Sequence, residues 1–209
     1  MTTKRAIIDL DGVVADNSVR MARAEQRRAW YRQHGGACLA EALAIPHQQA
    51  SVQQGFEALL ENLYWQTAFT PALVALDTLI PGADEAIVAL EARDFQIIYL
   101  TSRPEALRVA TQAWLHDAHL FGPQLVMKPP AAQDVKTTAW KALMVQMLAT
   151  WTWAEDLLYI DDEPANLAEL LKHAAPCARL RTAASLAAAL TATAQAQQPG
   201  EDSDADLPF

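Results

Sequence analysis

Short apolar runs alternate with longer amphipathic stretches along most of this chain. Runs rich in Ile, Leu and Val that are bounded by charged or turn residues predict β-strands. These runs cover residues 6–10, 95–102, 124–128 and 156–162, with a weaker run at 177–181. Apolar residues at helical spacing fill the intervals, at residues 82–94, 104–118, 135–151 and 166–174. Strands that alternate with helices predict an α/β fold with a parallel sheet covered on both faces.

One long segment, residues 17–80, interrupts this alternation, because its apolar residues keep helical spacing with no strand between them. Three helices are predicted there, at residues 17–34, 51–66 and 71–79. We therefore predict an α/β core built from residues 1–16 and 81–190, with residues 17–80 as an all-helical cap inserted after the first strand. Residues 191–209 are rich in Ala, Gln and Asp without periodicity, which predicts a disordered acidic tail.

The composition narrows the class of protein. The 209 residues are 52% apolar and carry a formal net charge of −9, of which four acids lie in the tail. This balance argues against a non-specific duplex-DNA binder, which needs a basic face. Cys38 and Cys177 are too few for a disulfide framework and indicate free thiols in a reducing cytosol. No apolar run reaches the ~20 residues that cross a bilayer, and the N-terminus lacks a signal-peptide core, so we expect a cytoplasmic protein without a membrane partner.

Polar and charged residues collect at the ends of the predicted strands. They are Asp9 and Asp11 after the first strand, Thr101 and Arg103 after the second, Lys128 at the third, and Asp161 and Asp162 at the fourth. Because ligands bind at the carboxyl ends of parallel strands, these side chains are expected to meet at one edge of the sheet. Unpaired carboxylates at the end of a buried strand are costly unless something cationic binds there. The pattern therefore predicts a cation at this edge.

Three segments and a downstream lysine together resemble the four motifs of the haloacid dehalogenase-like (HAD) phosphohydrolases. The segments read DLDGVVAD from Asp9, LTSRPE from Leu100 and YIDDEPAN from Tyr159. The resemblance covers most of residues 5–172 outside the insertion, and four motifs in this order are far more specific than any one alone. It implies a three-layer, Rossmann-like core with a parallel sheet and a helical cap after the first strand.

Within this superfamily the chain is most similar to the 3'-phosphatase domain of polynucleotide kinases. Arg20 follows Asp9 after eleven residues, and the second motif continues as SRPE with Arg103. The segment LVMKP ends the third strand and DVK follows it, whereas the helical insertion departs from that domain. This finer resemblance implies that the substrate is a phosphorylated nucleotide or a phosphorylated nucleic-acid end.

The resemblance also implies a Mg²⁺-dependent phosphomonoesterase. Asp9 would attack phosphorus to form an aspartyl phosphate, and Asp11 would protonate the leaving oxygen and later deprotonate the attacking water. Mg²⁺ would be held by Asp9, by the backbone carbonyl of Asp11 and by Asp162. Asp161 would act beside the metal or through water, and Thr101 would donate its hydroxyl to the phosphoryl oxygens.

A lysine is expected to hold the phosphate and the Asp9 carboxylate together. Lys136 is the preferred candidate because it stands in DVK at the start of a helix. Lys128 is the rival because it ends a strand, although a solvated strand end explains it equally well. Asn166, four residues after Asp162, would orient that turn.

Four residues are expected to bind the substrate: Arg20, Ser102, Arg103 and Lys128. A guanidinium group suits phosphate oxygens better than an ammonium group does. Arg20 stands near the start of a helix that leaves the active-site loop, so its side chain is expected to reach the mouth of the site. Arginines beyond those that one phosphate needs indicate further anionic groups in the substrate.

Other interpretations stay open. An Asp-x-Asp pair before Gly is often only a turn with capping carboxylates. A helical insertion in this superfamily commonly closes over small substrates, so a sugar or metabolite phosphate is the rival substrate. A non-catalytic phosphate-binding or partner-binding protein is the rival class. Trp30 or Trp65 of the insertion could face a base, although a place in the core is the simpler reading. The oligomeric state is not indicated.

Overall fold

A computed structural model of the chain describes residues 3–35, 49–120, 122–172 and 179–195. Cys38 and Cys177 lie outside the described residues, as does the tail after residue 195. Among the described helices, none is both long enough and apolar enough to span a bilayer.

The core is a five-stranded sheet whose strands are all parallel. In spatial order the strands are β5 (Gln124–Lys128), β4 (Phe95–Pro104), β1 (Lys4–Ile8), β6 (Asp156–Ile160) and β7 (Arg179–Ala183). Ile8, the last residue of β1, pairs with Tyr99 of β4 and with Ile160 of β6. The expected parallel sheet is confirmed, and the loops that follow its three central strands lie together at one edge.

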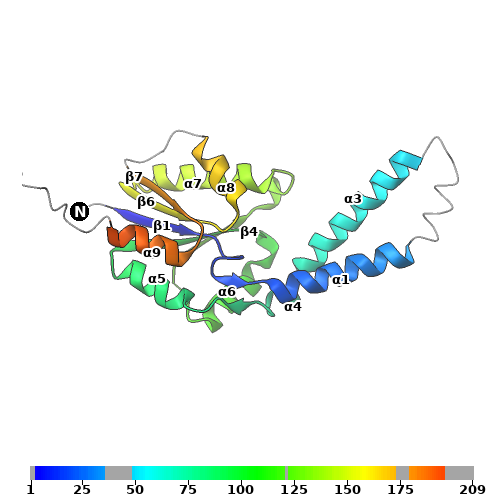
Figure 1. The fold of residues 1–209 in the computed structure, drawn as a ribbon, viewed down its shortest axis with the longest axis horizontal. Coiled ribbons are helices and arrows are strands. Elements are labelled where there is room, and N and C mark those ends of the chain that lie inside the picture. Colours follow the sequence, from blue (N-terminus) through cyan, green and yellow to red (C-terminus); the bar gives the residue numbers. More distant parts are fainter. Residues whose placement is uncertain (1–2, 36–48, 121, 173–178, 196–209) are drawn as a thin grey trace, which may run out of the picture.

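Helices cover both faces of this sheet and make three layers (Figure 1). One face carries α5 (Ala83–Glu91), α6 (Arg108–Asp117) and α9 (Leu186–Gln195), and the other carries α7 (Thr137–Trp151) and α8 (Pro164–Leu171). Short 3₁₀ turns, η2 (Glu105–Leu107) and η3 (Pro130–Ala132), follow β4 and β5. Side chains of a strand alternate between faces, so Ala6 and Ile8 pack under α5, and Ile7 packs under α7.

The cap leaves the core directly after β1 (Figure 1). Helices α1 (Ser18–His34) and α3 (Gln49–Ala68) pack side by side and extend away from the sheet, and α4 (Pro71–Val74) leads back. The chain enters and leaves the cap through a small antiparallel pair, β2 (Ala15–Asp16) and β3 (Thr78–Leu79). This pair was not expected, and it fixes the base of the cap on the core.

Two expected boundaries are wrong. The helix expected at 71–79 ends at Val74, because the chain turns to bury the Asp77 side chain against two arginines. The disorder expected from residue 191 does not hold for residues 191–195, since α9 continues to Gln195. Leu186, Ala189 and Thr193 of this helix are buried against the core at helical spacing.

Candidate active site

Asp9 lies at the carboxyl end of β1 and faces α7. Its backbone N–H donates to the carbonyl of Ile160 at 2.9 Å, which places Asp9 beside Asp161. One carboxylate oxygen, Oδ1, accepts from the backbone N–H of Leu10 at 2.9 Å, and Oδ2 accepts from Nζ of Lys141 at 2.5 Å. Only 5% of the Asp9 residue is exposed, so this is a buried carboxylate with a fixed orientation.

Lys141 is the lysine that contacts Asp9, and the sequence analysis did not single it out. Its ammonium lies between two carboxylates, 2.5 Å from Asp9 Oδ2 and 2.8 Å from Asp161 Oδ2. Lys141 is itself buried, and these two partners outweigh burial and raise its pKa. A signal was present, because Lys141, Val145 and Leu148 form one buried stripe of α7 at helical spacing. A lysine on such a stripe needs a buried anionic partner.

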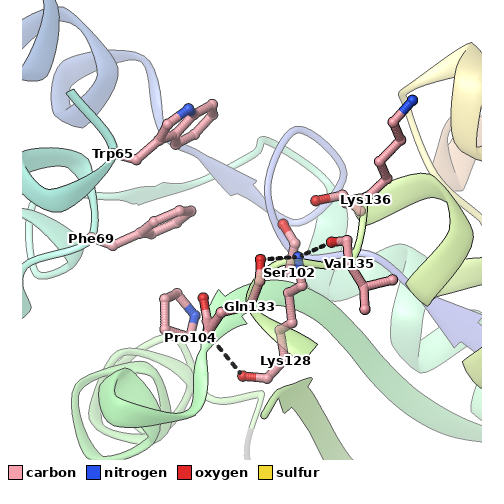
Figure 2. A pocket seen from close by; sticks show the side chains of 9 residues that line it. Trp65, Phe69, Ser102, Pro104, Lys128, Gln133, Val135 and Lys136 are labelled. Atoms are coloured by element: carbon pink, nitrogen blue, oxygen red, sulfur yellow. Dashed lines mark hydrogen bonds between the residues drawn. The ribbon is translucent and has the colours of Figure 1, made fainter. Parts of the chain in front are cut away.

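Lys136 and Lys128 lie elsewhere, so the expectation that one of them holds the Asp9 carboxylate is wrong, and the lysine that contacts Asp9 is Lys141. Lys136 precedes the first residue of α7, and its exposed side chain points away from Lys128 (Figure 2). Nζ of Lys128 donates to the carbonyls of Val135 at 2.6 Å and Gln133 at 3.4 Å, which fastens the loop after β5. Burial lowers the pKa of Lys128. The sequence analysis chose these two lysines by their position next to a helix start or a strand end, and such a position does not show which lysine contacts Asp9.

Asp161 is fully buried next to Asp9, and its carboxylate accepts hydrogen bonds from several residues. Besides Lys141, its carboxylate accepts from Tyr159 Oη at 2.5 Å, from Asn166 Nδ2 at 2.9 and 3.1 Å, and from the backbone N–H of Glu163 at 3.0 Å. These donors occupy both oxygens. Asn166 therefore orients Asp161 at the start of α8, close to the turn where the sequence placed it.

Asp162 is exposed and lies over the loop that follows β1. Gly12 in that loop has φ of +84°, a conformation that favours glycine. A Cβ on Gly12 would lie 2.1 Å from Oδ2 of Asp162, so only glycine allows this close approach. Partial burial of its carboxyl, followed by the neighbouring Asp161 charge, raises the pKa of Asp162. A bound cation would stabilise the ionised carboxylate of Asp162 against this effect.

The carboxylates fit a divalent cation. Asp9, Asp161 and Asp162 each offer an oxygen, and the three oxygens lie within 4.8 Å of one another. Oxygen donors of this kind suit Mg²⁺, which takes few protein ligands and keeps several waters. The Asp11 carboxylate is not part of this group of described residues.

Replacement of Asp162 is expected to weaken Mg²⁺ binding more than replacement of Asp161. Asp162 is free to turn to a metal, whereas the oxygens of Asp161 already accept from four residues. Asp162→Ala should raise the Mg²⁺ concentration for half-maximal binding at least about tenfold, while Asp161→Ala should mainly lower stability. Calorimetric Mg²⁺ titration of both variants checks this ranking, and the reverse ranking would make Asp161 the direct ligand.

Mg²⁺ binding is also expected to weaken as the pH falls through neutrality. In the metal-free protein, burial raises the pKa of Asp9 to about 7, against the opposing attraction of Lys141. Below that pH the carboxylate takes up a proton, which competes with the metal, so the apparent Kd should rise by up to about tenfold per pH unit. Titrations at pH 5.5, 6.5 and 8 measure this. In Asp9→Asn the dependence on Asp9 protonation should be absent.

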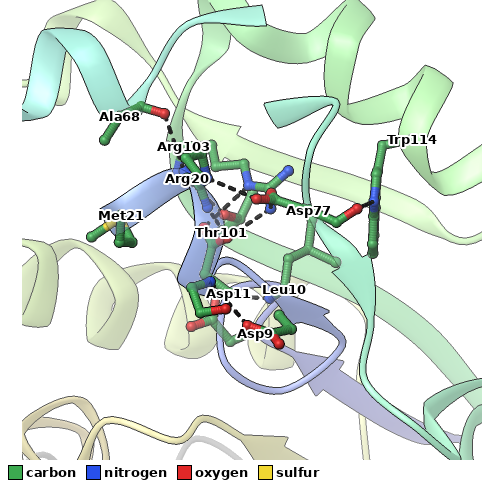
Figure 3. A network of polar contacts seen from close by, with 12 residues as sticks. Asp9, Leu10, Asp11, Arg20, Met21, Ala68, Asp77, Thr101, Arg103 and Trp114 are labelled. Carbon is green, nitrogen blue, oxygen red and sulfur yellow. Dashed lines mark hydrogen bonds and ion pairs between the residues drawn. The ribbon is translucent and has the colours of Figure 1, made fainter. Parts of the chain in front are cut away.

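Asp11 faces the other way, into a network of two arginines and two carboxylates (Figure 3). Arg103 donates to both oxygens of Asp11, from Nε at 3.1 Å and from Nη2 at 2.6 Å, and Nη2 also donates to Asp77 at 2.7 Å. Arg20 of the cap donates to Asp11 and, from Nε at 3.0 Å, to Asp77. Asp77 returns from the cap, so core and cap are both tied to Asp11.

The structure places Arg20 and Arg103, which were expected to bind the substrate, inside this network. Both are buried, with relative exposures of 1% and 0%, and each is paired with Asp11 and Asp77. Their charges are compensated within the protein, so they position Asp11 rather than reach the mouth. Asp77 was missed because a single acid in an apolar stretch gives no hint of partners far away in sequence.

The charge state of Asp11 follows from the same contacts. Burial by itself would raise the pKa of this carboxyl, but the attraction and hydrogen bonds of Arg103, together with Arg20, outweigh burial and lower it. Asp11 is therefore ionised at neutral pH in the free protein. A phosphate dianion placed beside it would act in the opposite direction, since like charges disfavour ionisation.

Two further expected residues lie at the end of β4. Thr101 is fully buried, and its Oγ1 accepts from the backbone N–H of Arg103 at 3.2 Å. Ser102 and Lys128 both line a pocket between core and cap, together with Trp65 and Phe69 of the cap (Figure 2). The structure thus brings most of the expected side chains to one edge of the sheet.

The fold is that of the HAD hydrolases, as comparison with solved structures shows. A phosphonoacetaldehyde hydrolase-like protein from Oleispira antarctica aligns with a TM-score of 0.57 at 16% identity, over 87% of this chain and 72% of its own. A protein from Clostridium acetobutylicum, described as a predicted phosphatase, aligns with a TM-score of 0.57 at 14% identity, over 87% and 84%. A HAD hydrolase from Bacillus subtilis bound to magnesium aligns with a TM-score of 0.50 at 15% identity, over 87% and 88%. No family model and no curated protein matches the sequence.

Proposed function

We propose that this chain is a Mg²⁺-dependent phosphomonoesterase that acts through an aspartyl phosphate on Asp9. The observation that carries the proposal is the Asp9 carboxylate, which is buried, oriented by Lys141 and close to the oxygens of Asp161 and Asp162. Fold alone does not license an activity, and this set of side chains at the sheet edge supports it. Asp9 and Asp162 would hold Mg²⁺, which neutralises charge on the carboxylate and the phosphate when bound.

The first half of the reaction uses Asp9 and Asp11. A carboxylate oxygen of Asp9 attacks phosphorus in line, and the bond to the leaving oxygen breaks as the bond to Asp9 forms. Lys141 holds Asp9 and supplies positive charge next to the entering phosphoryl group. Asp11, its pKa raised by the bound dianion, takes up a proton from solvent when the substrate binds and gives this proton to the leaving oxygen.

The second half regenerates the carboxylate. Asp11, again ionised by its arginine partners, takes a proton from water, which attacks the aspartyl phosphate and releases inorganic phosphate. The paired arginines fix the direction of Asp11 in both steps. Asp77 completes their charge balance, which makes it a positioning residue of this mechanism.

The proposed substrate is a phosphorylated nucleotide or the 3'-phosphate end of a nucleic acid. The sequence resemblance to 3'-phosphatase domains supports this class, and the pocket lined by Trp65, Ser102 and Lys136 next to the site leaves room for a large leaving group. A sugar or metabolite phosphate is the rival substrate. A panel of 3'- and 5'-phosphorylated oligonucleotides, mononucleotides and sugar phosphates, assayed side by side, separates these possibilities.

Removal of the metal is expected to abolish phosphatase activity. With p-nitrophenyl phosphate, EDTA should silence the protein and excess Mg²⁺ should restore it, because the nucleophile and the phosphate repel each other without a cation. Ca²⁺ should bind yet support little turnover, since its larger and looser coordination spoils the in-line geometry. Full activity in EDTA would exclude the proposed mechanism. No activity with any phosphomonoester under any metal would favour a non-catalytic binding protein.

A further inference from the structure

A pocket opens between the cap and the core beside the proposed active site (Figure 2). Its volume is about 370 Å³, within the range of small-molecule sites. Trp65 of α3 and Phe69, the residue that follows α3, form the cap side, and Ser102 and Pro104 of β4 are among the residues on the core side. The mechanism proposed above uses none of these four side chains.

The pocket lies where the leaving group of a bound phosphomonoester would extend. The Phe69 ring lies 5.5 Å from the guanidinium carbon of Arg20, and Arg20 donates to Asp11, which protonates the leaving oxygen. On the opposite side the pocket reaches Thr137, one helical turn before Lys141. Lys141 contacts Asp9, so the pocket lies beside the residues that would flank the reacting phosphate.

Trp65 is held as a flat platform. Its ring stacks on Phe69 with centroids 5.6 Å apart and an angle of 18° between the planes. Its indole N–H donates to Glu61 one turn earlier at 2.6 Å, which fixes the ring. Trp65 nevertheless remains 42% exposed and lines the pocket. The Trp65 ring is already held in one orientation, so a flat ring of a ligand can stack on it with little loss of side-chain entropy.

We propose that this pocket is a base-stacking subsite, in which Trp65, backed by Phe69, stacks on the nucleobase next to the scissile phosphate. The inference rests on the proposed phosphatase function and names the feature of the substrate that the cap recognises. The ligand is a purine or pyrimidine ring on a phosphorylated sugar, which a mononucleotide and the end of an oligonucleotide both provide. Lys136, exposed at the rim, is placed to attract a neighbouring phosphodiester.

The test compares two 3'-phosphorylated oligonucleotides that differ only at the last nucleotide, which either carries its base or is abasic. A nucleoside 3'-monophosphate forms a third arm, which separates mononucleotide from nucleic-acid substrates. The proteins are the wild type, Trp65→Ala, Trp65→Phe and Trp30→Ala. Trp30 is a matched control, since it is a tryptophan of the same cap, 54% exposed, and stacked on His34 rather than lining the pocket. Thermal melting verifies that each variant is folded.

The measured quantity is the ratio of kcat/KM for the base-bearing end to kcat/KM for the abasic end. Trp65→Ala should lower this ratio about tenfold or more, Trp65→Phe should retain most of it, and Trp30→Ala should leave it unchanged. Equal rates for both ends in the wild type, or an unchanged ratio in Trp65→Ala, would overturn the subsite while the phosphatase function stands. If the wild type hydrolyses neither end nor any other phosphomonoester, the proposed function fails and the subsite with it.

A direct binding measurement covers the case in which rates are limited by another step. Nucleoside 3'-monophosphate should quench tryptophan fluorescence in the presence of Ca²⁺, which should bind yet support little turnover, and most of that quenching should be lost in Trp65→Phe but not in Trp30→Phe. Quenching of the same size in both variants would also overturn the subsite.

Discussion

Asp9→Asn should remove phosphatase activity while leaving the folded protein intact. The amide keeps the shape of the carboxylate but has no nucleophilic charge, and covalent catalysis needs that charge. We expect kcat to fall at least about a thousandfold, as for the loss of other catalytic nucleophiles. Steady-state rates with p-nitrophenyl phosphate and with a 3'-phosphorylated oligonucleotide measure the loss.

Stability is the second readout for this variant. Burial raises the pKa of Asp9 to about 7, so the charge on Asp9 lowers the free energy of unfolding progressively as the pH rises from the ordinary carboxyl pKa of about 4 to about 7, and this loss is complete above that pH. Asparagine lacks that charge, and the variant should therefore be no less stable than the wild type at pH 8 in EDTA. Asp117→Asn, at an exposed acid in the last turn of α6, serves as the control. Activity of Asp9→Asn within tenfold of the wild type would exclude Asp9 as the nucleophile.

Lys141→Met should impair both activity and stability. Methionine fills a similar volume without charge, and it would leave Asp9 and Asp161 buried without the ammonium that now lies between them. Loss of one partner from a buried, hydrogen-bonded ion pair costs about 3–5 kcal/mol. We expect the free energy of unfolding in EDTA to fall by an amount of this order, and kcat/KM to fall about a hundredfold or more.

Lys136→Met is the matched control for this experiment. Lys136 is exposed at the start of the same helix, so its replacement should change the free energy of unfolding by no more than about 0.5 kcal/mol. Urea unfolding and p-nitrophenyl phosphate hydrolysis compare the two variants. A large loss of p-nitrophenyl phosphate activity in Lys136→Met, with little change in Lys141→Met, would return the role to the lysine that the sequence pattern favoured.

The strands of the core could be predicted because each is encoded locally. Buried parallel strands are short apolar runs, and polar residues end them where the sheet edge begins. The third cap helix could not be predicted in the same way. Its sequence is compatible with a helix to Leu79, but burial of Asp77 between Arg20 and Arg103 outweighs the local preference and turns the chain after Val74.

The site residues divide in the same way, into those whose position local sequence could predict and those that depend on contacts far away in sequence. Asp9, Asp161 and Asp162 were placed because strand order brings the ends of β1 and β6 together. Lys141 and Asp77 were missed because each acts in the middle of an apolar stretch, through a partner far away in sequence. Lys141 lies 132 residues from Asp9.

The pairing of the two arginines could not be predicted for a related reason. A sequence shows that Arg20 and Arg103 are cations near a phosphate site, but it does not show that Asp11 and Asp77 already compensate them. Through this pairing, Arg20 and Arg103 hold the Asp11 carboxylate in place.

The central claim is that Asp9 becomes phosphorylated during turnover, and acid-quenched mass spectrometry tests it most directly. The wild type is mixed with Mg²⁺ and substrate, quenched in acid, reduced with borohydride to convert an aspartyl phosphate into homoserine, and digested with trypsin. We expect homoserine at position 9 in the wild type and no conversion in Asp9→Asn or in EDTA. Rapid hydrolysis with no modified aspartate, or with homoserine at Asp11 instead, would contradict the account.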